Sequence, residues 1–167
     1  MRILILFLLL ISACAAADKQ TSKAYITNQG SNTVSVIDIK QNKVIHTIPV
    51  GKGPVGVAVS KTLKRVFITN VDSQNISVID TDTNKVIETI TTSGSPVGIA
   101  IAPNNKTIYV ADWYSDRILA IDTASYKSIG EIVVAKAPAG LAVSPDSAWL
   151  FVAARDSNEV VVINTAA

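Results

Sequence analysis

The sequence predicts an all-β fold, and three observations carry that prediction. From Lys23 onward the chain repeats every 42 residues without insertion or deletion. The apolar residues of each repeat lie in short runs rich in Val, Ile and Thr, and such runs favour strands. Gly, Pro, Asn and Asp separate the runs, and no stretch carries an apolar stripe at helical spacing long enough for a helix.

The repeats predict the architecture as well as the fold class. They form three complete units and the start of a fourth, at 23–64, 65–106, 107–148 and 149–167. In the second unit we expect strands at Arg65–Asn70, Asn75–Asp80, Lys85–Thr91 and 97–101. Four strands per unit, joined by hairpin-length turns, are typical of a β-propeller blade. We therefore predict a β-propeller of about four four-stranded antiparallel blades, with the first and last incomplete.

Several residue types recur in register, and each suggests a structural role. The aromatic series is Tyr25, Phe67, Tyr109 and Phe151, and the acidic series is Asp38, Asp80 and Asp122. We expect the aromatic residues to form one packing tier. We expect the carboxylates to accept backbone N–H bonds in the turns that follow their strands. Asn104-Asn105 suits a tight turn that needs a positive φ, and Thr83-Asn84-Lys85 suits a hairpin turn that contains Asn.

The repeated motifs resemble a known family. The segments that carry the resemblance are Tyr25-Ile26-Thr27-Asn28, Phe67-Ile68-Thr69-Asn70 and Tyr109-Val110-Ala111-Asp112. They are similar to the signature of the YVTN family of β-propeller repeats, and the likeness extends over residues 23–167. The last unit departs from the motif, with Ala154 in place of Asn. The resemblance implies the fold; for function it implies only kinship with surface and periplasmic propellers, including haem-binding and quinoprotein-associated ones.

The strand count leaves the closure of the propeller open. In the family that the repeats resemble, the Gly-Pro-Val segment begins the innermost strand of a blade, and this assignment implies fourteen strands, with three in the first blade and three in the last. An unclosed arc would expose two broad apolar sheet faces, which soluble monomers rarely do. Three outcomes remain: a cramped four-bladed ring, two copies that complete one eight-bladed ring as a homodimer, or part of a longer propeller. We favour the last two.

Residues 1–17 have the layout of a signal peptide. Arg2 precedes an apolar run at 3–11, and small residues follow at 12–17. One alternative is cleavage at a small-residue site ending at Ala15 or Ala17. The other is lipoprotein-type processing before Cys14, because Ile11-Ser12-Ala13 resembles the bacterial lipobox. In either case we expect residues 18–167 to be exported, periplasmic or on the cell surface, and to meet a membrane only through a lipid anchor.

The composition argues against several functional classes. The formal net charge of +2 is too small for a protein whose partner is nucleic acid. Cys14 and His46 are the only residues of their types, and no spacing suits a metal site. His46 aligns with positions of the outer strand, away from a central channel. We therefore expect no catalytic residues, no metal and no cofactor.

One loop stands out as a candidate binding site. In a propeller of this kind, the loops between the second and third strands share a face with the loops that lead into each new blade. On that face Trp113, Tyr114, Asp116 and Arg117 replace the small polar residues of the equivalent loops. Exposed Trp, Tyr and Arg are typical anchors for a partner. The competing interpretation is that Trp113 or Tyr114 folds back to cap the edge of the blade.

Three basic residues of the same face are further candidates. Lys52, Lys136 and Arg155 could form a mildly positive rim, or they could be ordinary solvated charges. These features predict an exported, non-catalytic propeller that binds an envelope protein or a surface polymer. The alternative is an enzyme or cofactor-associated propeller, lactonase-like or linked to a quinoprotein or haem dehydrogenase, that acts through a shared or longer ring. A purely structural surface-layer module is a third class.

Overall fold

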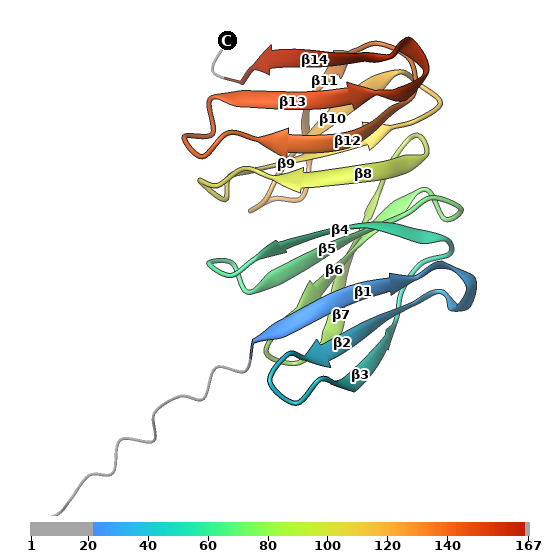
Figure 1. Cartoon of the computed structure of the whole chain (residues 1–167), viewed down its shortest axis with the longest axis vertical. Helices are drawn as coiled ribbons and strands as arrows, with labels where there is room; N and C mark the ends of the chain where they lie inside the picture. Colours follow the sequence, from blue (N-terminus) through green and yellow to red (C-terminus); the bar gives the residue numbers. More distant parts are fainter. Residues whose placement is uncertain (1–21, 166–167) are drawn as a thin grey trace, which may run out of the picture.

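The structure, a computed structural model, describes residues 22–165, which build four antiparallel sheets stacked side by side (Figure 1). Blade 1 contains β1 (Lys23–Asn28), β2 (Thr33–Asp38) and β3 (Lys43–Pro49). Blade 2 contains β4 (Pro54–Ser60), β5 (Arg65–Asn70), β6 (Asn75–Asp80) and β7 (Lys85–Thr91). Blade 3 contains β8 (Pro96–Ile101), β9 (Thr107–Asp112), β10 (Arg117–Asp122) and β11 (Ser128–Val133). Blade 4 contains β12 (Pro138–Val143), β13 (Trp149–Ala154) and β14 (Glu159–Asn164).

These blades confirm the predicted all-β fold and the expected number of strands. Each sheet follows chain order, with three strands in blades 1 and 4 and four in blades 2 and 3. Within residues 22–165 the only helices are two 3-10 turns, Gln29–Ser31 and Arg155–Ser157. The signal peptide and the lipidation site at Cys14 lie outside the described residues.

Blades 1, 2 and 3 share the same irregularity in the pairing of their outer strands. Strands β2, β6 and β10 each pair with the following outer strand, and each ladder shifts register at an equivalent position, after Val36, Val78 and Ala120. A β-bulge of this kind bends a strand and increases its local twist. The outer strand of each of these three blades therefore turns away from the inner strands at the same point.

The core lies between the blades. We call the side of a blade that faces the next blade its forward face, and the opposite side its rear face. Phe67, Ile76 and Val78 on the forward face of blade 2 pack against Ile108 and Val110 on the rear face of blade 3. Equivalent positions form the cluster between blades 1 and 2 and the one between blades 3 and 4. Both faces of the middle blades are thus buried, as their apolar patterns predict.

Most of the recurring residues take the expected roles. Tyr25, Phe67 and Tyr109 are buried in the three inter-blade clusters and form the expected packing tier, whereas Phe151 of the same series is 40% exposed. In the turn after β6, the Oδ1 atom of Asp80 accepts the N–H groups of Asp82 and Thr83, at 3.0 and 2.8 Å. Asp38 and Asp122 accept equivalent bonds in their own turns. Asn84 and Asn105 have φ values of 53° and 59°, as the turn chemistry predicts.

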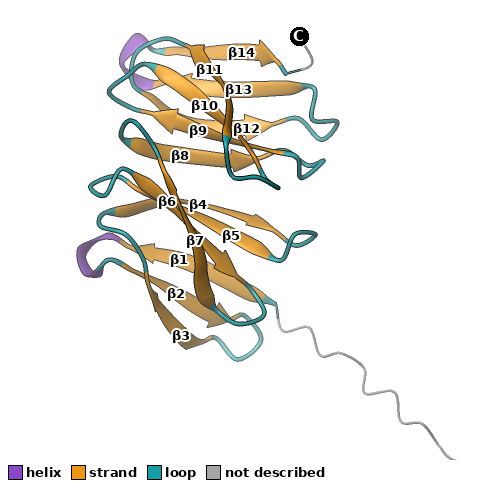
Figure 2. Ribbon diagram, turned by 180° about the vertical axis from the view of Figure 1, so that it is seen from behind, coloured by secondary structure: helices purple, strands orange, loops and turns teal. Residues whose placement is uncertain are grey.

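The four blades form an open arc. Blade 1 and blade 4 lie at opposite ends of the stack in both views (Figures 1 and 2). The described residues therefore do not close a four-bladed ring, and that alternative is wrong. No helix among them is long and apolar enough to cross a membrane.

Close contact between the innermost strands depends on glycine. A Cβ atom added to Gly98 in β8 would lie 1.7 Å from the carbonyl oxygen of Ala139 in β12, whereas one added to Gly130 in β11 would meet nothing within 4 Å. We expect Gly98→Ala to lower the free energy of unfolding by about 1–3 kcal/mol, because blades 3 and 4 must separate to admit the methyl group. Gly130→Ala is the matched control and should cost little. Urea unfolding of both variants measures the difference, and equal losses would contradict this role of Gly98.

The turn at Asp80 predicts a loss of stability in acid. The hydrogen bond from the Thr83 N–H group, helped by the bonds of the Thr83 hydroxyl and the Asp82 N–H group and by the Arg65 charge, holds the pKa of Asp80 below its usual 3.8. The unfolded chain therefore takes up the proton first, and stability falls as the pH drops below about 4. In thermal melts, Asp80→Asn should be less stable than the wild type at about pH 7 and lose less on acidification. An unchanged acid loss would show that Asp80 is not involved.

Candidate functional site on the loop face

The equivalent loops β1–β2, β5–β6, β9–β10 and β13–β14 end in one shared conformation. Each of these four loops finishes on a non-glycine residue with left-handed backbone, with φ between 50° and 56°. The four residues are Asn32, Gln74, Asp116 and Asn158. Asn and Asp tolerate this conformation better than most residues, which explains three of the four choices. Asp116, a sequence candidate for binding, therefore shapes its turn.

Hydrogen bonds join these loops to the loops that lead into the next blade. The Oδ1 atom of Asn32 accepts the N–H of Gly53 at 3.0 Å, and that of Asp116 accepts the N–H of Ala137 at 2.9 Å. Backbone hydrogen bonds also join each entry loop to the loop of the blade that it enters. For example, the N–H of Arg155 in the β13–β14 loop donates to the carbonyl of Ala137 in the β11–β12 loop, at 3.1 Å. The loop face is thus a connected rim, which can hold side chains in fixed positions.

Two aromatic residues of the β9–β10 loop are held differently. Trp113 is half-buried, and the guanidinium carbon of Arg155, in the β13–β14 loop, lies 4.7 Å from its ring centroid in a cation–π contact. Tyr114, the next residue, is 80% exposed. Trp113 therefore contacts a residue of the neighbouring blade, whereas Tyr114 is exposed to solvent.

Charged residues surround this aromatic pair. Nε of Arg155 also lies 2.9 Å from Oδ1 of Asp156. Lys136 is exposed in the adjoining β11–β12 loop, where its carbonyl accepts the N–H of Asp156 at 3.3 Å. The structure thus gathers Trp113, Tyr114, Lys136 and Arg155 at the junction of blades 3 and 4. We call these four residues the aromatic patch.

The other sequence candidates lie elsewhere or have structural partners. Lys52 is in the β3–β4 loop, where its carbonyl accepts the N–H groups of Asp72 and Ser73, so it belongs to the junction of blades 1 and 2. Arg117 contacts Asp112 at 2.9 Å, Glu131 at 2.7 Å and the hydroxyl of Ser93 at 2.7 Å.

Arg117 and a buried carboxylate tie the strands of blade 3 to the β7–β8 loop that leads into this blade. The side chain of Asp112 is only 1% exposed, and its other oxygen accepts the N–H of Ser95 at 2.9 Å. Hydrogen bonding to Asp112 raises the pKa of the Arg117 guanidinium, with a further contribution from Glu131. The Arg117 head group is therefore engaged on several sides within the propeller.

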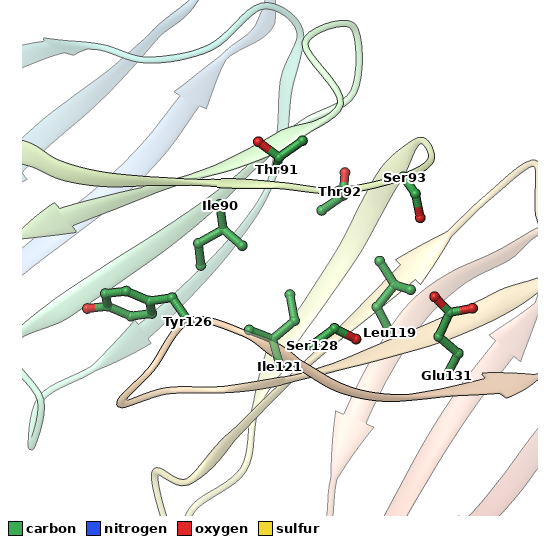
Figure 3. Close-up of a pocket in the computed structure, with 9 residues that line it drawn as sticks. All are labelled: Ile90, Thr91, Thr92, Ser93, Leu119, Ile121, Tyr126, Ser128 and Glu131. Atoms are coloured by element: carbon green, nitrogen blue, oxygen red, sulfur yellow. The ribbon is translucent and has the colours of Figure 1, made fainter.

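Sequence reasoning missed a cleft between the outer strands of blades 2 and 3. It has a volume of about 260 Å³, with Ile90, Leu119, Ile121 and Tyr126 among its lining residues (Figure 3). Ser128 lines it at the position where blade 2 has Val86, and this smaller polar residue was the signal in the sequence. The cleft adjoins a second hollow of about 440 Å³ that shares Ile90, Tyr126 and Ser128 with it, a size within the roughly 300–1,000 Å³ usual for small-molecule sites.

His46 lies exposed in β3, the outer strand of blade 1, as its alignment predicts. Among residues 22–165, no three His, Cys, Asp or Glu side chains are placed to hold one metal ion.

The stacked blades and their loop face define a β-propeller. A family model described as the YNCE-like beta-propeller matches residues 58–149, more than half of the chain. The chain therefore belongs to the YNCE-like β-propeller family. This confirms the class of repeat protein that the sequence predicts, and the narrower YVTN assignment stays a prediction.

Two further similarities are informative. A chain of hydrazine synthase from Kuenenia stuttgartiensis has the same fold, with a TM-score of 0.81 and 28% identity, over 87% of this chain and 43% of that one. PE-PGRS family protein PE_PGRS18 of Mycobacterium tuberculosis (strain ATCC 25618 / H37Rv) is 67% identical over 36 residues, which are 22% of this chain and 8% of that protein. The chain thus spans less than half the length of each of these proteins.

The two arginines of blades 3 and 4 should differ sharply in their effect on stability. Arg117→Met leaves the buried Asp112 carboxylate without its cation, so we expect the free energy of unfolding to fall by about 3 kcal/mol. Arg155→Met removes only exposed contacts and should cost less than about 1 kcal/mol. Chemical denaturation of the two variants checks this. Similar losses for both would mean that the buried Asp112 ion pair does not stabilise blade 3.

Proposed function

We propose that this protein is an exported, non-catalytic β-propeller that binds another protein of the cell envelope through the aromatic patch. The observation that carries the proposal is the pairing of an 80% exposed Tyr114 with a Trp113 held by Arg155 across two blades. Tyr and Trp offer a large contact area and lose little side-chain entropy on binding, and with Arg they dominate protein-binding hot spots.

The charges around the patch favour a protein partner over a polyanion. Arg155 is paired with Asp156, and the backbone of Asp156 is hydrogen-bonded to that of Lys136, so one carboxylate lies among the two basic residues. The patch is therefore mixed in charge, and Lys52 lies at another blade junction, so no continuous positive rim supports anion binding. A mixed, aromatic surface on rigid loops is suited to a folded protein surface.

The export and the narrower family assignment are parts of this proposal. The residues before Asp18 have the composition of a signal peptide, with Cys14 as the candidate for lipid attachment. The Tyr-Ile-Thr-Asn motif at 25–28 and its counterparts support a YVTN-type repeat. A lipid anchor at Cys14 would hold the propeller at a membrane surface.

A second candidate function is a propeller that belongs to an enzyme assembly. The similarity to a hydrazine synthase chain favours it, because that protein is named for an enzyme and this chain matches 43% of its length. In that case catalytic groups would come from other parts of the assembly. The aromatic patch would then be one contact among several.

Replacing the exposed tyrosine should weaken partner capture without affecting the fold. We expect Tyr114→Ala to reduce binding of the captured envelope protein by about tenfold or more, as loss of a hot-spot residue does. Val133→Ala, a truncation of an 86% exposed side chain on the outer strand of blade 3, is the control. The measurement is capture from solubilised envelope of the producing cell, followed by titration of the purified partner.

The outcomes separate the two functions. Equal capture by Tyr114→Ala, Trp113→Ala and the wild type would contradict binding through the patch. Capture of an enzyme complex that is insensitive to both substitutions would support the second function. Melting temperatures of all variants confirm that each comparison is made between folded proteins.

A further inference from the structure

The forward face of blade 4 is apolar and uncovered among the described residues. Phe151 is 40% exposed, Val160 63% and Val162 54%. The residues one repeat and two repeats earlier are Tyr109, Ile118 and Ala120 in blade 3, and Phe67, Ile76 and Val78 in blade 2, all of them buried. Among the described residues, blade 4 thus leaves uncovered the same kind of surface that is buried at every internal junction.

The rear face of blade 1 is uncovered in the same way. Ile26 is 49% exposed and Val44 57% exposed. One repeat later, Ile68 is fully buried and Val86 packs against the cluster between blades 1 and 2. Two repeats later, Val110 is buried in the cluster between blades 2 and 3.

The two uncovered faces correspond to the two sides of each internal junction. Each internal junction packs a forward face with an aromatic or aliphatic tier against a rear face rich in Ile and Val, and this occurs three times in the chain. We propose that the forward face of blade 4 docks on the rear face of blade 1 of a second copy of this chain, head to tail. This inference is independent of the aromatic patch.

Two features favour a second copy as the occupant. The forward face of blade 4 preserves the internal pattern at matching positions, with Phe151 in place of Phe67 and Val162 in place of Val78, so a rear face of this chain's own sequence fits it. No charged residue lies among the exposed positions at the centre of either face: Ala142, Phe151, Ala153, Val160 and Val162 on blade 4, and Ile26 and Val44 on blade 1. A desolvated centre without charges is typical of permanent contacts between subunits.

The contact is heterologous, because each chain contributes two different surfaces. A heterologous contact relates each chain to the next by a rotation. When a whole number of such rotations completes a full turn, the chains form a closed ring, and otherwise they form an open filament. Two chains joined at both ends would bring together eight blades and leave neither apolar face in water. The two ends of the arc lie apart in Figures 1 and 2, so a partner can reach both.

Light scattering after size exclusion tests the proposal on the purified wild-type protein. We expect a mass of at least two chains that falls toward one chain on dilution. A mass of one chain at all concentrations overturns the proposal, whether the faces then stay bare or are covered by another protein. Val162→Asp on blade 4 and Ile26→Asp on blade 1 should each reduce self-association at least tenfold. Val133→Asp, on an exposed strand outside both faces, should leave it unchanged.

Mixing the two variants identifies the mode of contact. Val162→Asp retains a normal blade 1 and Ile26→Asp retains a normal blade 4, so the mixture should form one heterodimer and stop at two chains. If blade 4 instead docks on blade 4, the Ile26→Asp variant alone would keep the wild-type mass and mixing would add nothing. That result overturns the head-to-tail contact.

A measurement on the unmodified chain covers the case in which a variant fails to fold. Circular dichroism reports the fold of each variant. Hydrogen exchange of the wild type at low and high concentration should show added protection at high concentration in β1–β3 and β13–β14. Protection that is independent of concentration in both regions contradicts the proposal.

Discussion

The structure depends on apolar packing between the faces of neighbouring blades. No blade has a core of its own, because each is a single sheet whose two faces must both be covered. Phe67 and Val110 are fully buried only because blades 2 and 3 meet. Each middle blade must therefore present one apolar face to the blade before it and one to the blade after it. The repeat of 42 residues in the sequence reflects this requirement.

The loop face follows from the same stacking. Packing brings the loops of successive blades together, and side chains such as Asp116 then bond to the backbone of the next blade. On that framework the Trp113–Arg155 contact can form between residues 42 positions apart, and it leaves Tyr114 exposed on a rigid support. The binding role proposed for the aromatic patch uses positions that the inter-blade core has already fixed.

The sequence predicted the fold in detail because its signals are local and repeated. Strand positions, Asn turns, the Asp turns and the aromatic tier all come from short patterns that recur in register. The fate of individual loop side chains depends on contacts between blades, which no local pattern contains. Arg117 resembled a surface anchor in sequence, but the structure pairs it with Asp112. The cleft beside Ser128 is lined by residues of two neighbouring blades, so its shape depends on how these blades pack.

Comparing Phe67→Ala with Phe151→Ala tests the central claim most directly, because the same residue type stands at equivalent positions on a covered and an uncovered face. Unfolding by urea at protein concentrations low enough to keep chains apart is the measurement. Phe67→Ala should lower the free energy of unfolding by about 3–5 kcal/mol, as loss of a buried aromatic ring does. Phe151→Ala should cost less than about 1 kcal/mol. Equal losses at the two positions would contradict the account that inter-blade burial holds this protein together.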